Sequence, residues 1–414
     1  MRSYSIIFLL LWPMSLMAQD CFKNIDISVN NPWRTGIING TIKAGPRAQI
    51  TALAFSADNT ILASGGYREV LLWNLPASKL EKRIQLNSFH GNVRSLKFLS
   101  GNKLLLGCGD PGFSGALHLI DITDNSLIAS FFEPKDAVTD LAISANEKYA
   151  VAGDATGAVY VYDLEKKILV KQFSNITGEI SGIEFGDNDS KLIVSSLSGQ
   201  LRIWDTSDWS LFFSQDFPDP ITGVCGFRKG NQLVMALNGE SFSGIKILGI
   251  RKNPNRRSVS NERNSFSLGG SRPCGVAADT ASRFIVVPCS DGHVEVIFPF
   301  NANKNKLFQA HSVPVNVVAL TSNKVFFATG DAEGCIKLWD AGVQRLAATL
   351  VQPQSLSDGW LIISYHGYYT GSDSRLISWS FDKQDEGRET ELFDVEKLSG
   401  TTWPKPASEK KNSK

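Results

Sequence analysis

The chain has 414 residues, with 42 Lys and Arg against 41 Asp and Glu, so its formal net charge is +1. This balance argues against a nucleic-acid-binding surface, which needs a marked excess of basic residues. With 43% hydrophobic and 20% charged residues, the composition is that of an ordinary globular protein with enough apolar side chains for a large core.

The first 18 residues, MRSYSIIFLLLWPMSLMA, are typical of a secretory signal peptide. Arg2 precedes an apolar run from Ile6 to Trp12, and a small residue, Ala18, ends the stretch. The run is shorter than the roughly 20 residues that span a bilayer, although a membrane anchor is the alternative interpretation. We therefore expect an exported protein, periplasmic or extracellular, with residues 19–46 forming an N-terminal segment and no membrane insertion after cleavage.

A strand-like stretch ending in a large apolar residue and then Asp recurs along the chain. It is clearest in QLRIWD at 200–205. Copies of this stretch, some weak, end at Trp73, Ile120, Tyr162, Trp204, Leu248, Ile297 and Trp339, with spacings of 47, 42, 42, 44, 49 and 42 residues. Two strand patterns precede each copy, one apolar run follows it, and turn-forming Asn, Asp and Ser separate them. Such a period, with four short strands per unit, indicates propeller blades.

These units resemble the tryptophan-aspartate (WD) repeat family over roughly Arg47–Val351. The resemblance implies an all-β fold, a seven-bladed β-propeller with four-stranded blades. The last outer strand would come from RLAATL at 345–350 or from the N-terminal GIINGTIK at 36–43. Because propellers host many activities, the resemblance specifies the fold and says little about function.

In this family the Trp has a structural role, linked by hydrogen bonds to a Ser or Thr, an Asp and a His of the same blade. His311, Thr329 and Trp339 match that pattern, but Glu333 stands where the family has Asp. His90 occupies a similar place in a blade that has Ile120 for the Trp. For most blades we therefore expect apolar packing between sheets to supply the cohesion.

Six cysteines and five histidines are spread along the chain. Cys274 and Cys289 fall near the open ends of two strands joined by DTASR, so a disulfide between them is one interpretation, and two small buried residues is the other. There is no Cys-x-x-Cys motif, and the histidines show no metal-binding spacing. We expect no metal site and no cofactor.

After Val351 the sequence SDGWLIISYHGYYTGSDSRLISW departs from the repeat. It resembles a hairpin that follows propellers in some bacterial WD-repeat proteins, with His366 where a Pro is common. The matching residues are Trp360, Gly367, Tyr368, Tyr369 and Trp379. This extension, at 352–383, would pack against the propeller's edge or expose an aromatic docking surface. Residues 384–414 lack periodicity and are predicted to be a mobile tail.

The sequence contains no nucleophile elbow and no Walker loop. Its Gly-rich stretch CGDPGFSG at 108–115 is predicted to join two strands with no helix following, so it does not form the phosphate-binding turn of a dinucleotide fingerprint. We therefore favour a monomeric, non-catalytic propeller acting as a protein–protein interaction scaffold. An exported propeller enzyme, hydrolase or quinoprotein-type, is the alternative, with its site at the mouth of the central channel. The basic stretch at 250–263 would be a solvated insertion or a site for an acidic partner.

In the WD family, loops between second and third strands share one face with the loops that enter each first strand, and partners commonly use that face. Aromatic residues and Arg dominate binding energy in such loops, although the aromatics could instead fold inward. The residues predicted for this face are Tyr67, Arg68, His90, Phe113, Lys135, Glu240, Phe242 and Arg272.

Overall fold

The computed structural model describes residues 25–30, 37–42, 48–86, 91–186, 188–227, 232–251, 258–279, 283–342, 344–352, 359–364, 369–372 and 377–380. Within these ranges the chain is almost entirely β-strand, apart from one short 3₁₀ turn, η2, at Ala302–Lys304. None of the helical structure in these ranges is long and apolar enough to cross a membrane.

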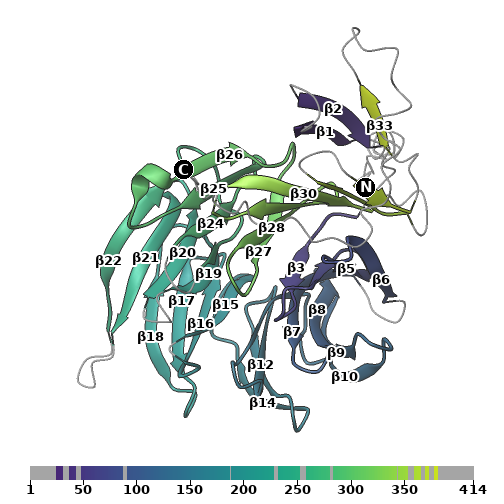
Figure 1. Cartoon of the computed structure of the whole chain (residues 1–414). Helices are drawn as coiled ribbons and strands as arrows, with labels where there is room; N and C mark the ends of the chain where they lie inside the picture. Colours follow the sequence, from purple (N-terminus) through teal and green to yellow (C-terminus); the bar gives the residue numbers. More distant parts are fainter. Residues whose placement is uncertain are drawn as a thin grey trace, which may run out of the picture.

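Seven antiparallel sheets, each built from four consecutive strands, are arranged around a centre as the blades of a propeller (Figure 1). The first strand of a blade lies near the middle and the fourth lies on the outside. The seven-bladed all-β prediction is confirmed.

The strands of the first four blades have the following bounds. Blade 1 contains β3 Ala52–Phe55, β4 Ile61–Gly65, β5 Glu69–Asn74 and β6 Lys79–Gln85; blade 2 contains β7 Asn92–Leu99, β8 Lys103–Asp110, β9 Ser114–Asp121 and β10 Leu127–Phe131. Blade 3 contains β11 Val138–Ile143, β12 Tyr149–Asp154, β13 Val159–Asp163 and β14 Ile168–Phe173; blade 4 contains β15 Ile180–Gly186, β16 Lys191–Ser196, β17 Gln200–Asp205 and β18 Leu211–Asp216.

The remaining three blades continue the same order. Blade 5 contains β19 Ile221–Phe227, β20 Gln232–Asn238, β21 Ser243–Arg251 and β22 Ser258–Ser267; blade 6 contains β23 Ala277–Ala278, β24 Ile285–Pro288, β25 His293–Ile297 and β26 Lys306–Gln309; blade 7 contains β27 Val315–Leu320, β28 Phe326–Asp331, β29 Cys335–Asp340 and β30 Arg345–Val351. Part of the basic stretch at 250–263 therefore extends β21 and β22, and its residues 252–257 lie outside the described ranges.

The ring closes without exchanging a strand between its first and last blades. The fourth strand of blade 7 is β30, so RLAATL and not GIINGTIK supplies it. At the junction, Ile50 N donates to Asp331 O over 2.9 Å, as Val93 N donates to Gly66 O at the junction of blades 1 and 2. The last junction therefore repeats the backbone contact of the first.

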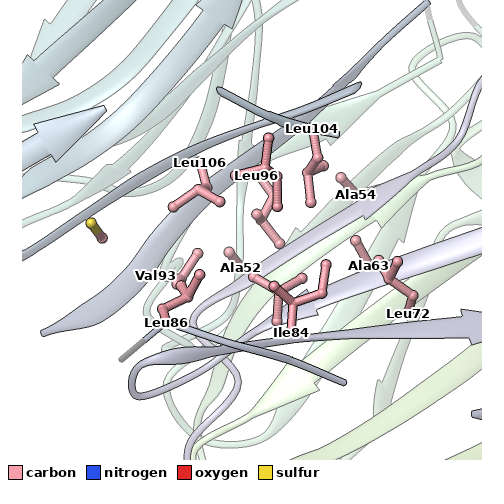
Figure 2. Close-up of a cluster of buried hydrophobic side chains, with 13 residues drawn as sticks. Ala52, Ala54, Ala63, Leu72, Ile84, Leu86, Val93, Leu96, Leu104 and Leu106 are labelled. Atoms are coloured by element: carbon pink, nitrogen blue, oxygen red, sulfur yellow. The ribbon is translucent and has the colours of Figure 1, made fainter. Parts of the chain in front are cut away.

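Apolar packing between neighbouring sheets forms the core. Each buried cluster combines residues from two adjacent blades, and together the clusters cover all seven junctions. Figure 2 shows the one between blades 1 and 2, where Leu72 and Ile84 face Val93 and Leu96. Trp204 is 2% exposed and stacks on Phe173 of the preceding blade at 4.5 Å, so its role is structural.

A glycine near the end of the second strand lets the next blade approach closely in four blades. A Cβ there would collide with the β-branched residue that begins the next blade, and close-packed interiors tolerate such overlap poorly. The pairs are Gly65 with Val93, Gly107 with Val138, Gly153 with Ile180, and Gly330 with Ile50. The sequence therefore sets the spacing of these blades by placing a glycine, which has no side chain, opposite a Val or Ile of the next blade.

Two additions lie outside the seven blades. β31, Leu361–Ser364, pairs with the outer edge of β30, and β32, Tyr369–Gly371, pairs with β31. β1, Ile25–Asn30, β2, Ile37–Ile42, and β33, Ile377–Ser380, form a separate three-stranded sheet. The expected C-terminal extension thus does pack against the propeller's edge, but its last strand joins the N-terminal segment. His366, Gly367, Tyr368 and residues 384–414 lie outside the described ranges.

Replacing Gly330 with Ala should destabilise the ring at its closing junction. The added Cβ would overlap Ile50, and overpacking of this kind costs about 2 kcal/mol. Chemical denaturation of the full chain measures the change in the free energy of unfolding. Gly226→Ala is the matched control, because its Cβ would lie 3.6 Å from its nearest neighbour, Glu184 Oε1. Equal stability for the two variants would contradict the role assigned to this contact.

Candidate functional site

Two sets of loops meet at one end of every blade. Because neighbouring strands are antiparallel, the second-to-third-strand loop lies at the same end as the loop that enters the next first strand. Hydrogen bonds join the two sets: Leu86 N donates to Arg68 O over 2.9 Å, and Gly112 N donates to Asp136 Oδ1 over 2.7 Å. We call this end of the disc the front face.

The predicted front-face residues differ in exposure. Tyr67 is 55% exposed and Phe113 is 85% exposed. Phe242 is instead half-buried, with its ring 5.0 Å from Lys246 Nζ and packed on the core between blades 4 and 5. Arg68 is also half-buried, at a positive φ of 57°. The aromatics at Tyr67 and Phe113 therefore face solvent, and the one at Phe242 folds inward.

Four predicted front-face residues remain, of which three are charged. Lys135, Glu240 and Arg272 are exposed. His90 lies outside the described residues.

Sequence reasoning missed two exposed apolar residues on the same face. Phe132, 71% exposed, follows β10, and Leu197, 40% exposed, lies in the loop between β16 and β17. Phe132 stands edge-on to the ring of His118, with 5.8 Å between centroids. A signal was present, because Phe131 and Phe132 are adjacent at a strand end, where successive side chains point to opposite faces.

Tyr67, Phe113 and Phe132 come from loops that are linked to one another. Tyr67 bridges Asn92, and the loop of Phe113 is tied to the loop of Phe132 through Gly112 N and Asp136. We call these three side chains the aromatic patch. It spans blades 1 and 2 on the front face.

The channel at the centre of the ring is polar at its mouth. Arg94 Nη1 contacts Glu179 Oε1 at 2.9 Å, linking blades 2 and 4. Thr51 Oγ1 donates to Val93 O over 2.5 Å, and Thr139 Oγ1 donates to Ile180 O over 2.6 Å. These polar side chains therefore connect one blade to another around the channel.

Two cavities, of about 460 Å³ and 450 Å³, follow one another along the channel and share part of their lining. Asp140, in both linings, accepts hydrogen bonds from Ser95 Oγ at 3.1 Å and Ile183 N at 2.8 Å. Burial raises the pKa of Asp140 and of Glu184, and it lowers the pKa of Lys324. The positive charge of Lys97, in the lining of the second cavity, acts against burial and lowers the pKa of both carboxyl groups.

One blade contains a buried chain of polar side chains around its Trp. Trp339 Nε1 donates to Thr329 Oγ1 over 2.9 Å, and His311 Nε2 lies 2.7 Å from the same hydroxyl. His311 Nδ1 lies 2.8 Å from Asp331 Oδ2. Burial lowers the pKa of His311. His311, Asp331 and Cys335 are also close enough to surround a metal ion, but these hydrogen bonds already account for the His and the Asp.

The acidic residue of this hydrogen-bonded network is Asp331. From the sequence we expected Glu333, and that expectation was wrong. Asp331 Oδ1 accepts hydrogen bonds from Glu333 N at 2.9 Å and from Cys335 N at 2.8 Å, so it also holds the turn that contains Glu333. A sequence signal existed: an Asp ends the second strand in CGD, AGD and TGD, at Asp110, Asp154 and Asp331.

The proposed disulfide between Cys274 and Cys289 is absent, because both thiols are free. Cys289 lies opposite Pro273 in the pairing, and Cys274 N donates to Pro288 O over 2.9 Å. Cys274 lines the channel, whereas Cys289 lies in the core between blades 5 and 6. The pairing is thus shifted by one residue from the one that a bridge needs.

Two family models match the chain. Residues 46–247 match the N-terminal domain of Nucleolar protein 10-like proteins, described as a β-propeller, and residues 303–340 match the WD domain, G-beta repeat. The two matches together include most of the blades.

The chain spans less than two fifths of the length of the first two curated relatives described here. Transducin-like enhancer protein 2 of Mus musculus is 27% identical over 49% of this chain and 26% of its own length. Transducin beta-like protein 3 of Homo sapiens is 21% identical over 70% of this chain and 38% of its own length. WD repeat-containing protein 55 of Arabidopsis thaliana is 18% identical over 71% of this chain and 80% of its own length.

These comparisons overturn the expected periplasmic or extracellular location. The longer family match is to a protein named as nucleolar, and another relative, from Caenorhabditis elegans, is named a transcription factor. The expectation rested on Arg2 and the apolar run that follows. Such a run shows only that the segment is hydrophobic and does not by itself identify a secretory signal. Residues 1–24 lie outside the described ranges.

Replacing Asp331 with Asn should lower the free energy of unfolding by about 2 kcal/mol, because it removes a charged acceptor that serves His311 and two backbone N–H groups. Glu333→Gln, two residues away, should change it by less than about 0.5 kcal/mol. Thermal and chemical denaturation of both variants compare them. A larger loss for Glu333→Gln would return the acidic role to Glu333.

His118 should make the protein less stable as the pH falls below about 6.5. Its side chain is 1% exposed, and burial lowers its pKa to about 4. Between about pH 6.5 and pH 4 the unfolded chain therefore binds a proton at His118 that the folded chain does not bind. Stability is full above the unfolded pKa and falls by about 3 kcal/mol on approaching pH 4.

Denaturation at pH 7 and pH 4.5 measures this loss, and the difference between wild type and His118→Gln isolates it from the titration of carboxylates. The variant should show the smaller loss. Parallel pH profiles for the two proteins would show that His118 titrates alike in the folded and unfolded states.

Proposed function

Because this chain belongs to the WD-repeat β-propeller family, we propose that it is a non-catalytic scaffold that binds a protein partner through its front face. The observation that carries the proposal is the aromatic patch, in which Tyr67, Phe113 and Phe132 are each more than half exposed. Large aromatic side chains are stabilised by burial, so three of them left in water on one face favour an association site.

The anchoring of these loops supports the same proposal. The hydrogen bonds from Leu86 N to Arg68 O and from Gly112 N to the Asp136 carboxylate hold the loops before any partner arrives. A loop that is already ordered loses less conformational entropy on binding. Exposed Lys135 lies in the same loop as Phe132 and would form part of a polar rim beside the aromatic patch, as binding surfaces commonly have. Exposed Glu240 and Arg272 lie in blade 5 and in the loop that enters blade 6, away from the patch.

The enzymatic alternative would place a site at the mouth of the channel. The polar side chains described there are engaged in joining blades: Arg94 with Glu179, Thr51 with Val93, and Asp140 with Ser95 and Ile183. A catalytic acid or base must be free to reach a substrate proton. These contacts therefore favour the scaffold over the enzyme.

Replacing Tyr67, Phe113 and Phe132 together with Ala should abolish partner binding and leave the melting temperature within a few degrees of wild type. Aromatic anchors of this kind contribute about 2 kcal/mol or more each when truncated. In-cell crosslinking followed by mass spectrometry compares the proteins captured by the variant and by wild type.

Phe300→Ala is the control, because Phe300 is 58% exposed in the turn between β25 and β26, at the opposite end of the disc. It should leave capture unchanged. If the triple variant captures the same partners as wild type, the front face is not the binding site.

A further inference from the structure

The outer strand of a propeller blade is an open sheet edge, and this chain shows how one such edge is covered. In blade 7, β31 pairs with β30 at four positions, from Ala348 opposite Ser364 to Val351 opposite Leu361. Ala348 and Thr349, in the paired part of β30, are buried. An open edge presents unpaired N–H and C=O groups that a further extended segment can use.

The added strand occupies one half of β30. β30 has a bulge at Ala347, which has no partner on β29 because Leu346 pairs with Trp339 and Ala348 pairs with Leu338. β31 pairs with the part of β30 that follows this bulge. Bulges disrupt pairing at sheet edges. Comparable bulges interrupt β6, β10, β14, β18 and β22, so the half of an outer strand beyond the bulge is where an added strand fits.

One other edge has the composition of the covered one. By register, Ala129 opposite Leu119 in blade 2 corresponds to Ala348 opposite Leu338 in blade 7. The sequence from that point is Ala-Ser-Phe-Phe at 129–132, against Ala-Thr-Leu-Val at 348–351. The same half of the other outer strands reads KRIQ, KQFS, FSQD, NSFS and KLFQ, each with a charge or an amide.

Charged residues on an edge oppose strand addition, and β10 lacks them. Lys167 Nζ donates to Ile128 O at the bulge over 3.2 Å and leaves the half beyond it uncovered. Ala129 and Ser130 are half-buried, whereas their counterparts Ala348 and Thr349, which pair with β31, are buried. In the described part of the chain, β10 is the last strand of its sheet.

We propose that the edge of β10 at Ala129–Phe132 accepts an extended, uncharged apolar segment of the protein partner as a fifth strand of blade 2. The proposal rests on the proposed function, because Phe132 belongs to both the aromatic patch and this edge, so a partner on the front face can continue down β10. The segment resembles β31, whose Leu361, Ile362 and Ile363 are all nearly fully buried on the edge of blade 7.

The test uses the full chain and a synthetic peptide of the sequence GWLIIS, from 359–364, flanked by lysines for solubility. Hydrogen–deuterium exchange is followed at β10 with and without the peptide. Amides in Ala129–Phe132 should exchange at least about tenfold more slowly with the peptide, and those of β14 and β18 should not change. The same peptide methylated on alternate backbone nitrogens keeps its side chains but cannot pair, and it should give no protection.

Ala129→Lys places a charge on this edge and should remove the protection, with Ser214→Lys on β18 as the matched control that retains it. Absence of protection in wild type overturns the proposal without needing either variant to fold. Protection that appears without peptide and rises with protein concentration also overturns it, because the occupant is then a second copy. Loss of partner binding in the front-face variant together with no protection of β10 leaves the proposed function standing and removes only the edge site.

Discussion

Ile50 lies in the space that Gly330 leaves by having no side chain, and the same contact recurs between Val93 and Gly65, Val138 and Gly107, and Ile180 and Gly153. The rest of the structure depends on this approach of one sheet to the next. It sets four of the junctions, including the one that closes the ring. Since no strand is exchanged between blades 7 and 1, closure rests on the apolar cluster there and on the bond from Ile50 N to Asp331 O.

The front face follows from this arrangement. Rigid neighbouring sheets fix where each second strand ends and where each first strand begins, so the loops between them are held at one end of the disc. Sheet cohesion is supplied by buried residues such as Trp204 and Leu72, which leaves loop residues such as Tyr67 and Phe113 free of a packing role. A scaffold needs this division, because its binding residues can change without loss of the fold.

The repeat made the fold predictable, because seven copies of one strand pattern all indicate the same architecture. Single positions were harder. Glu333 was assigned to the network from its place in the family pattern, because the sequence does not show which carboxylate a buried His311 reaches. The bridge between Cys274 and Cys289 remained one of two interpretations, because the sequence does not fix strand register to one residue. Phe132 was missed because exposure at a strand end depends on the neighbouring loop. The location was wrong because an apolar run carries no more than hydropathy.

The most direct test of the account asks which residue of the disc touches the partner in the cell. A photo-crosslinking amino acid placed at Phe113, on the front face, is compared with the same amino acid at Phe300, at the opposite end. We expect crosslinks to a partner protein from position 113 and not from position 300. Crosslinks of equal yield from both positions, or from position 300 alone, would contradict a front-face scaffold.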